Sequence, residues 1–237
     1  MTQSQIHPRP DQIAELTRGL SLPLPMLNPL HMKVIASGLA LAARSVSLDH
    51  PAIWTVGSEA EINAIVETRL NRLIDEDSRW NQLVDCVVRG KETLSFDGSH
   101  LETRPDLSIF LTNRSRAFPL VVECKLIEVA VGKNEGLYCT SGLSRFVTGK
   151  YGWGGQEAMM LGYVRDGSTI DGLLIPYLTG PLAGTTFATQ QIPQACGIAE
   201  HDIAASLHGR NFTYIHAHGA PGSIAVWHIW VGEPVAS

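Results

Sequence analysis

The stretch RPDLSIFLTNRSRAFPLVVECKLIEV, residues 104–129, decides the fold of this chain. It contains two apolar runs, RPDLSIFLT (104–112) and AFPLVVECKLIEV (117–129), and the polar link NRSR (113–116) joins them. Two apolar runs joined by a short polar link are typical of a β-hairpin. The sequence therefore predicts two neighbouring antiparallel strands at this point of the chain.

The link also predicts which residues of the two strands face each other. A turn centred between Arg114 and Ser115 puts Asp106 opposite Glu123, although a bulge at Pro119 would shift this register by about one residue. Directly opposed residues have Cβ atoms about 5 Å apart, and two like charges at that distance are destabilising. A divalent cation between the two carboxylates removes the repulsion, and carboxylate oxygens suit Mg²⁺.

The second strand adds a cation to these two carboxylates. Glu123 and Lys125 lie two residues apart and therefore share one face of the strand, whereas Cys124 points into the core. Charges within an apolar sheet are costly unless they are paired or bind a metal. Beside a metal, Lys125 can orient a water molecule or stabilise the charge that develops on a phosphate group.

Pro105-Asp106 followed by Glu123-Cys124-Lys125 resembles the signature of the PD-(D/E)xK nuclease superfamily, and the resemblance covers about residues 58 to 165. It implies an α/β fold with a restriction-endonuclease-like core, in which helices flank a mixed central β-sheet. It also implies a hydrolase that uses Mg²⁺, with Mn²⁺ as a substitute. By position, the metal ligands are Asp106, Glu123 and the backbone carbonyl of Cys124, while Lys125 assists the attack of water on a phosphodiester.

A helix before the hairpin supplies a further candidate. Ser58 can cap a helix over residues 59–77, whose apolar positions repeat at helical spacing as Ile62, Val66, Leu70 and Leu73. In the family that the chain resembles, this helix often adds an acidic residue to the site. Glu59 lies within the apolar stripe, Glu67 lies at its edge and Glu61 faces away, so we expect Glu59 to join the catalytic and metal-binding set. The alternative is that Glu59 only stabilises the helix N-terminus through the helix dipole.

The segment YCTSGLSRFVTGKYGWGGQEAMMLGY, residues 138–163, resembles more loosely the helical region of bacterial nucleases linked to restriction or phage defence. We expect helices over residues 137–148 and 156–163. The resemblance implies contacts with nucleic acid from this region, and the candidates are Arg145, Lys150, Tyr151 and Gln156. The alternative for the two cations is a solvated helix face.

Composition narrows the class of protein. The 237 residues carry a net charge of −5, with 44% hydrophobic and 17% charged residues, which excludes a disordered chain, a collagen-like repeat and a coiled coil. An acidic protein does not coat nucleic acid broadly, but a few Arg and Lys residues in a cleft suffice for local contact. The low charged fraction suggests that a partner covers part of the surface. The four cysteines are far apart, so neither a zinc ribbon nor a disulfide scaffold is expected.

The remaining sequence gives the expected organisation. Residues 1–50 are predicted to form a proline-rich N-terminal arm with helices over 11–20 and 30–44, and residues 51–237 to form the nuclease-like domain. Further strands are predicted at 83–90, 172–178, 212–217 and 223–231, with Trp227 and Trp230 in the core or an interface. The chain lacks a signal-peptide pattern at its start and has no apolar stretch near the ~20 residues of a membrane span, so we expect a cytoplasmic protein.

The sequence thus predicts a metal-dependent nuclease that acts on DNA, with RNA as a possible substrate, in a bacterial restriction or anti-phage defence system. Restraint of such an enzyme implies a homo-oligomer or a protein partner, such as an ATPase, helicase or sensor subunit. The first alternative is a catalytically silent subunit of the same fold that acts as a scaffold. The second is a metal-dependent hydrolase built on the C-terminal histidines His216, His218 and His228.

Overall fold

The predicted hairpin lies in the middle of a seven-stranded mixed sheet with the order β1-β2-β3-β4-β7-β6-β5. A computed structural model describes residues 10–99, 103–198, 202–215 and 219–232. The strands are β1 (Val84–Arg89), β2 (Leu107–Leu111), β3 (Leu120–Ile127), β4 (Glu157–Val164), β5 (Thr189–Ala195), β6 (Asp202–His208) and β7 (Ile224–Val231). The pairs β3–β4 and β4–β7 are parallel and the other pairs are antiparallel, so the chain is an α/β protein with a mixed sheet.

The hairpin has the register that its turn predicts. Leu107 pairs with Val122, Ser108 with Val121 and Ile109 with Leu120, and no bulge interrupts the pairing at Pro119. Asp106 and Glu123 are the next residues along the two strands, just past the last pair. The predicted register is therefore confirmed for these three pairs, and the two carboxylates lie at the open end of the hairpin, where the pairing has ended.

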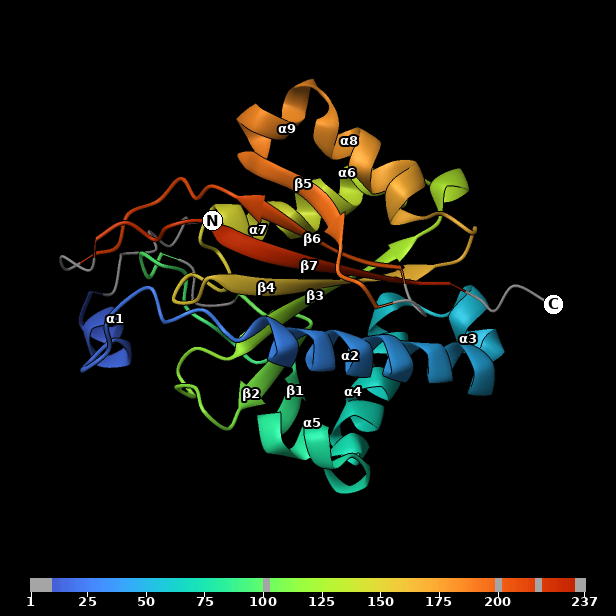
Figure 1. Ribbon diagram of the computed structural model, residues 1–237, viewed down its shortest axis with the longest axis horizontal. Helices are drawn as coiled ribbons and strands as arrows, with labels where there is room; N and C mark the ends of the chain where they lie inside the picture. Colours follow the sequence, from blue (N-terminus) through green and yellow to red (C-terminus); the bar gives the residue numbers. More distant parts are fainter. Residues whose placement is uncertain (1–9, 100–102, 199–201, 216–218, 233–237) are drawn as a thin grey trace, which may run out of the picture.

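Helices cover both faces of the sheet, as Figure 1 shows. One face carries α2 (Pro29–Asp49), α3 (Pro51–Val56), α4 (Glu59–Glu76) and α5 (Ser78–Leu83). The other carries a helical run of α6 (Glu135–Tyr138), a π-helical turn (Cys139–Leu143) and α7 (Ser144–Val147), followed along the chain by a second π-helical turn (Ile170–Leu174), α8 (Ile175–Thr179) and α9 (Pro181–Thr186). Alternate residues of β3 belong to the two cores, with Val122 and Cys124 on the first face and Val121 and Ile127 on the second.

Helix α4 begins where the sequence predicts. The Ser58 hydroxyl accepts a hydrogen bond from the Glu61 backbone N–H and the Glu61 carboxylate accepts one from the Ser58 N–H, which is a complete capping box. The buried residues of α4 are Ile62, Asn63, Val66 and Leu70. This cap fixes the first turn of the helix, and therefore fixes where Glu59 lies.

Helix α2, which the sequence analysis assigns to an N-terminal arm, packs in the same core as the sheet. Its buried residues, among them Ile35, Leu39 and Val46, share one cluster with α4 and β3. It is also longer than the predicted 30–44, because it begins after the Asn28 cap and ends at Asp49. None of the described helices is both long and apolar enough to cross a membrane.

Two predictions of secondary structure are wrong. Residues 157–163 of the predicted helix 156–163 belong instead to the central strand β4, in which all eight residues Glu157–Val164 are buried. A strand covered on both faces reads as a continuous apolar run without alternation, and pairing with β3 and β7 outweighs the helix propensity of Ala, Met and Leu. Residues 172–178, predicted as a strand, are helical, because the Thr169 hydroxyl accepts a hydrogen bond from the Gly172 N–H and starts a helix there.

Of the other predicted helices and strands, some are confirmed and some are not. The strands at 83–90 and 223–231 are confirmed as β1 and β7, and Trp227 and Trp230 are buried. The helix at 137–148 is confirmed, although it contains a π-helical turn, and that at 11–20 is shorter, as α1 (Pro10–Leu16). The described part of the predicted strand 212–217, residues 212–215, is not a strand, and β5 and β6 were not predicted. The polar sequence of β5 and its Pro193 suit only the edge strand that it is.

Candidate active site

Four charged side chains from three separate segments of the chain meet at the open end of the hairpin. Glu59 comes from the first turn of α4, Asp106 from the residue before β2, and Glu123 and Lys125 from β3. The Lys125 ammonium lies 2.8 Å from Glu123 Oε1, 3.3 Å from Glu59 Oε1 and 3.8 Å from Asp106 Oδ2. It also donates a hydrogen bond of 2.6 Å to the Cys124 carbonyl. The groups predicted as metal ligands thus surround the ammonium, and we call them the carboxylate–lysine cluster.

Two of the carboxylates also bind the backbone of β3. The Cys124 N–H donates to Asp106 Oδ2 at 2.8 Å, and the Leu126 N–H donates to Glu59 Oε2 at 2.9 Å. Strand β2 has already diverged at this point, since the last paired residue is Leu107. The carboxylates therefore take the place of the missing strand partner. Glu59 contacts β3 and does not act only on its own helix terminus, which Glu61 caps.

Asn63 joins the cluster although the sequence analysis did not single it out. Its amide donates to Asp106 Oδ1 at 3.2 Å, and its side-chain oxygen accepts a hydrogen bond from the Tyr163 hydroxyl at 2.6 Å. Asn63 is 2% exposed, which a polar residue tolerates only when it is hydrogen-bonded. Its signal in the sequence was its spacing, because Asn63 follows Glu59 by one helical turn and shares its face.

Glu123 is the most buried carboxylate of the cluster. Its Oε1 accepts hydrogen bonds from Lys125 and from Arg145, at 2.8 and 2.7 Å, whereas its buried Oε2 has no hydrogen-bond partner among the described residues. Burial raises the pKa of Glu123 to about 7; the Lys125 charge opposes this rise and the Asp106 charge adds to it. Burial lowers the pKa of Lys125, but the nearby carboxylates outweigh burial and raise it above its usual value.

Of the four predicted nucleic-acid contacts, two lie at the cluster. Arg145 donates to Glu123 and, at 3.1 Å, to the Tyr151 hydroxyl, which donates to the Arg104 carbonyl at 2.9 Å. Burial, with the Glu123 charge adding to it, raises the pKa of Tyr151 to about 12. Gln156 is turned elsewhere, toward the Leu24 carbonyl at 2.9 Å. Lys150 has no hydrogen bond or ion pair with the described residues of the cluster.

An open cleft of about 470 Å³ lies beside the cluster. Its lining residues are Ser58, Glu59, Ala60, Asn63, Arg89, Gly90, Arg104, Pro105 and Asp106. Arg89 and Arg104 stand on its rim with side chains 41% and 61% exposed, each also paired with a glutamate. The sequence analysis did not select either arginine, although Arg104 directly precedes Pro105-Asp106. The cleft is thus lined by the acidic side chains of Glu59 and Asp106 and by the two arginines.

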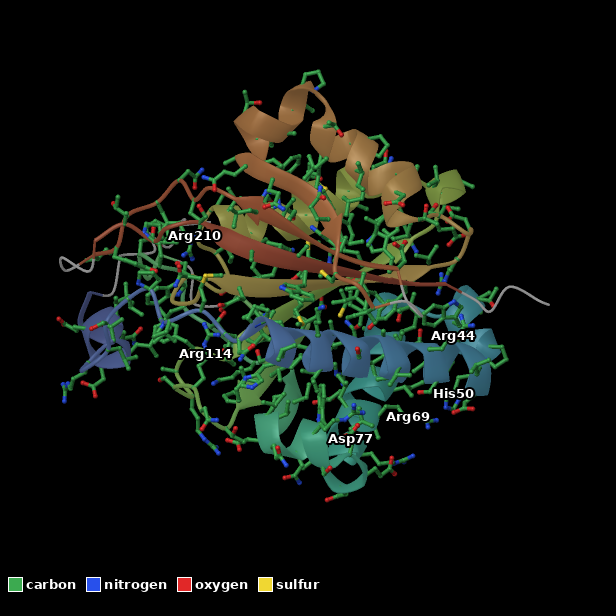
Figure 2. All side chains as sticks on the ribbon, viewed as in Figure 1. Arg44, His50, Arg69, Asp77, Arg114 and Arg210 are labelled. Carbon is green, nitrogen blue, oxygen red and sulfur yellow. The ribbon has the colours of Figure 1, made fainter. Side chains whose placement is uncertain are left out.

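A second pocket, of about 140 Å³, shares no residue with the cluster. It surrounds a buried ion pair of 3.1 Å between Arg114 and Glu157, where Glu157 also accepts a hydrogen bond from the Leu27 N–H. Figure 2 shows Arg114 and Arg210 on the same side of the view as α1. Arg210 donates to the Gly155 carbonyl at 2.8 Å, so both arginines hold the segment that enters β4.

The donor atoms of the cluster are of the type that binds a divalent metal, but their geometry in this structure does not form a metal site. Among the residues that the structure describes, no three or more His, Cys, Asp and Glu side chains are arranged to hold a metal ion. Lys125 explains this, because its ammonium lies where the carboxylates converge. The donors are nevertheless carboxylate and carbonyl oxygens, which hard cations prefer, and Glu123 Oε2 is a buried carboxylate oxygen without a partner. The residues therefore fit Mg²⁺ once the side-chain cations that pair with the carboxylates rearrange.

Of the three C-terminal histidines of the alternative metal site, His228 is the one that the structure describes. His216 and His218 lie outside the described residues, and His228 is fully buried in β7. Both ring nitrogens of His228 are engaged, Nδ1 with the Tyr138 hydroxyl at 3.0 Å and Nε2 with Ser206 Oγ at 2.7 Å. His228 therefore has no free nitrogen for a metal, and the prediction that it could serve as a ligand is wrong.

Comparison with protein-family models, with curated proteins and with solved structures found no match to this chain. The geometry of the carboxylate–lysine cluster is therefore the basis on which a function is inferred below.

Proposed function

We propose that this protein is a metal-dependent nuclease of the PD-(D/E)xK type, with a restriction-endonuclease-like core, that hydrolyses phosphodiester bonds of DNA. The observation that carries the proposal is the convergence of Glu59, Asp106 and Glu123 on Lys125. Three carboxylates within reach of one ammonium leave an excess of negative charge. Bringing these carboxylates together does not stabilise the fold by itself. Such a collection of hard oxygen ligands is what a catalytic divalent cation requires.

Each residue has a role in this proposal. Asp106, Glu123, Glu59 and the Cys124 carbonyl would hold Mg²⁺ or Mn²⁺. When bound, such a cation lowers the pKa of water and stabilises charge on phosphate oxygens. Lys125 would position the attacking water or stabilise the developing negative charge. Asn63 orients Asp106 through the hydrogen bond between them.

The cleft supports a nucleic-acid substrate. Arg89 and Arg104 border it, and guanidinium groups bind phosphate oxygens in a two-pronged geometry. With a net charge of −5, the chain offers its phosphate contacts locally and not over a broad surface. DNA is the first substrate to test and RNA the second.

Regulation by a partner or by self-assembly belongs to the proposal. The outer face of α2 carries Leu30, Leu41 and Leu48, which are 67%, 53% and 58% exposed. At helical periodicity these three leucines share one face, and Val56 of α3 is 81% exposed. An exposed apolar stripe of this kind supports a binding surface, for a second copy or for an ATPase, helicase or sensor subunit of a defence system.

The experiment is a cleavage assay on plasmid, linear duplex, single-stranded DNA and RNA, each with Mg²⁺, Mn²⁺ or EDTA. Glu123→Gln is the inactive variant to compare, because it keeps the size of the side chain and a carbonyl oxygen for Lys125 and Arg145. Arg116→Gln, whose side chain is 74% exposed and pairs with Asp85 away from the cluster, is the control. Metal-dependent cutting by the parent and the control but not by Glu123→Gln supports the nuclease. Cutting that survives Glu123→Gln refutes this site.

A silent scaffold subunit of the same fold is the second candidate. The observation that favours it is that Lys125 and Arg145 pair with Glu123, and that no three His, Cys, Asp or Glu side chains of the described residues are arranged to bind a metal ion. Calorimetric titration with Mg²⁺ and Mn²⁺ separates the two candidates. Binding that Asp106→Ala abolishes favours the nuclease, whereas no binding by the parent favours the scaffold.

A further inference from the structure

Arg145 is placed by an irregular helix so that it reaches Glu123. The run from α6 to α7 is interrupted by the π-helical turn Cys139–Leu143, and Arg145 follows in the first turn of α7. A π-turn widens a helix and rotates the residues after it, and such turns are frequent at functional sites. Arg145 Nη1 lies 2.7 Å from Glu123 Oε1, and its guanidinium carbon lies 5.2 Å from the centre of the Tyr151 ring.

The charges around Glu123 would be overcompensated by a bound metal. Three carboxylates face two cations, Lys125 and Arg145, so the group carries one negative charge in excess. A divalent ion among the carboxylates would turn this into one positive charge in excess. Like charges at a few ångströms repel strongly in a partly buried site, so a side-chain cation must then move outward.

Arg145 is the cation that can leave at lower cost. Its side chain is 31% exposed, against 13% for Lys125, and Glu123 is its only carboxylate partner among the described residues. Lys125 is held by Glu123, by Glu59 and by the Cys124 carbonyl. Arg145 also donates a hydrogen bond to the Tyr151 hydroxyl. This neutral group can keep the arginine side chain near the cluster after the guanidinium has left Glu123.

We propose that Arg145 has two positions: it neutralises Glu123 while the site is free of metal, and it binds a phosphate of the nucleic-acid substrate once a divalent cation is bound. The proposal rests on the nuclease function proposed above. It makes Arg145 both a competitor of the metal and a contact for the substrate. Arg145→Gln therefore has opposite effects on the two affinities.

Metal titration of the substrate-free protein tests the first position. Arg145→Gln is expected to bind Mn²⁺ about tenfold more tightly than the parent in calorimetry, because a competing charge has been removed. Arg145→Lys, which keeps the charge, should stay close to the parent. The matched control is Arg116→Gln, since Arg116 is 74% exposed and pairs with Asp85 away from the cluster. Unchanged or weaker Mn²⁺ binding by Arg145→Gln overturns the proposal.

Duplex binding tests the second position. With Ca²⁺ as the hard cation and gel analysis to verify that the duplex stays intact, Arg145→Gln should bind a fluorescein-labelled DNA about tenfold more weakly in an anisotropy titration. The slope of log affinity against log salt should fall by about 1, as expected for one lost phosphate contact. Tighter metal binding with unchanged duplex binding overturns the two-position model. A loss of both affinities overturns it too when urea unfolding shows that the variant folds like the parent, and Arg145→Lys provides the comparison when it does not.

The parent protein reports separately on the nuclease function. If the parent binds Mn²⁺ but cuts no nucleic acid, cleavage by the chain alone is refuted, while the ratio of variant to parent affinities still supports or overturns the role of Arg145. If the parent cuts and Arg145→Gln changes neither affinity, only the proposal for Arg145 fails. If the parent binds no metal, both fail.

Discussion

The backbone N–H of Cys124 donates a hydrogen bond of 2.8 Å to the carboxylate of Asp106, across the point where β2 leaves β3. A strand that loses its neighbour leaves backbone N–H groups without partners, and a buried N–H without a partner is costly. Asp106 satisfies that N–H and at the same time brings its negative charge to Glu123 and Lys125. The opening of the hairpin and the assembly of the charged cluster are therefore one structural event.

The two roles of Asp106 can be separated by substitution. Asp106→Asn keeps an oxygen for the Cys124 N–H, whereas Asp106→Ala leaves both that N–H and the Asn63 amide without their partner. We expect urea unfolding to show a loss of about 1–3 kcal/mol for Ala and a smaller loss for Asn. Both should abolish cleavage and weaken metal binding, because both remove the charge. Equal destabilisation by the two variants would contradict the proposed backbone role.

Lys125→Met is expected to separate catalysis from metal binding. The variant should lose cleavage but bind Mg²⁺ at least as tightly as the parent, because the ammonium no longer lies among the carboxylates. Without metal it should be less stable by about 3 kcal/mol, since a buried carboxylate loses its partner. Added Mg²⁺ should therefore raise the melting temperature of the variant more than that of the parent. Weaker Mg²⁺ binding would show that Lys125 supports the metal site.

The two arginines on the rim of the cleft should contribute to substrate binding and not to metal binding. Arg89→Gln and Arg104→Gln are each expected to weaken duplex binding and to reduce the salt slope by about 1. Their Mn²⁺ affinities should match that of the parent, in contrast to Arg145→Gln. Anisotropy titrations at several salt concentrations measure the slopes, and Arg116→Gln serves as the control. An unchanged slope in both rim variants would exclude the cleft as the path of the nucleic acid.

The elements that the sequence predicts correctly are those whose signals are local. The turn NRSR gives the hairpin register, and Ser58 gives the start of α4. These two signals place Asp106, Glu123 and Lys125 along the hairpin and Glu59 in the first turn of the helix. The apolar stripe of the helix, together with the family resemblance, selects Glu59 over Glu61 and Glu67.

The features that were missed depend on packing between distant segments. Strand β4 was predicted as a helix because its burial on both faces removes the alternation that identifies a strand. Arg145 was predicted to face solvent or phosphate, since nothing in the sequence shows that a π-helical turn aims it at Glu123. The hydrogen bonds that link Asn63 to Asp106 and to Tyr163 likewise could not be predicted, because they depend on how α4, β2 and β4 pack together.

A chain of buried hydrogen bonds makes the stability depend on pH. The Phe187 carbonyl can only accept, so His208 Nδ1 donates to it at 2.9 Å and His208 Nε2 is an acceptor. Ser206 then donates to His208 and accepts from His228 Nε2, both at 2.7 Å, which leaves His228 Nδ1 to accept from the Tyr138 hydroxyl. This chain of hydrogen bonds is complete with both histidines neutral, and burial lowers the pKa of His208 to about 4 and that of His228 to about 3.

The sign of this effect follows from linkage. Between pH 6.5 and about 4 the unfolded chain binds protons at both histidines and the folded chain does not. As the pH decreases through this range, the free energy of unfolding therefore decreases by up to about 1.4 kcal/mol per unit for each histidine. Glu123 acts in the opposite direction. Its pKa rises from 4.5 to about 7 on folding, so between these values the folded chain binds the proton and gains stability as the pH falls.

Urea unfolding between pH 7 and pH 5 can resolve the two contributions. Glu123→Gln removes the opposing carboxyl group, so its stability should fall more steeply with decreasing pH than that of the parent. His208→Asn keeps a donor for the Phe187 carbonyl but binds no proton, so its slope should be shallower than that of the parent by up to about 1.4 kcal/mol per unit. The slope is the quantity to compare, because either substitution also shifts stability at every pH. A slope that His208→Asn leaves unchanged would mean that the buried histidine does not control the acid sensitivity of this fold.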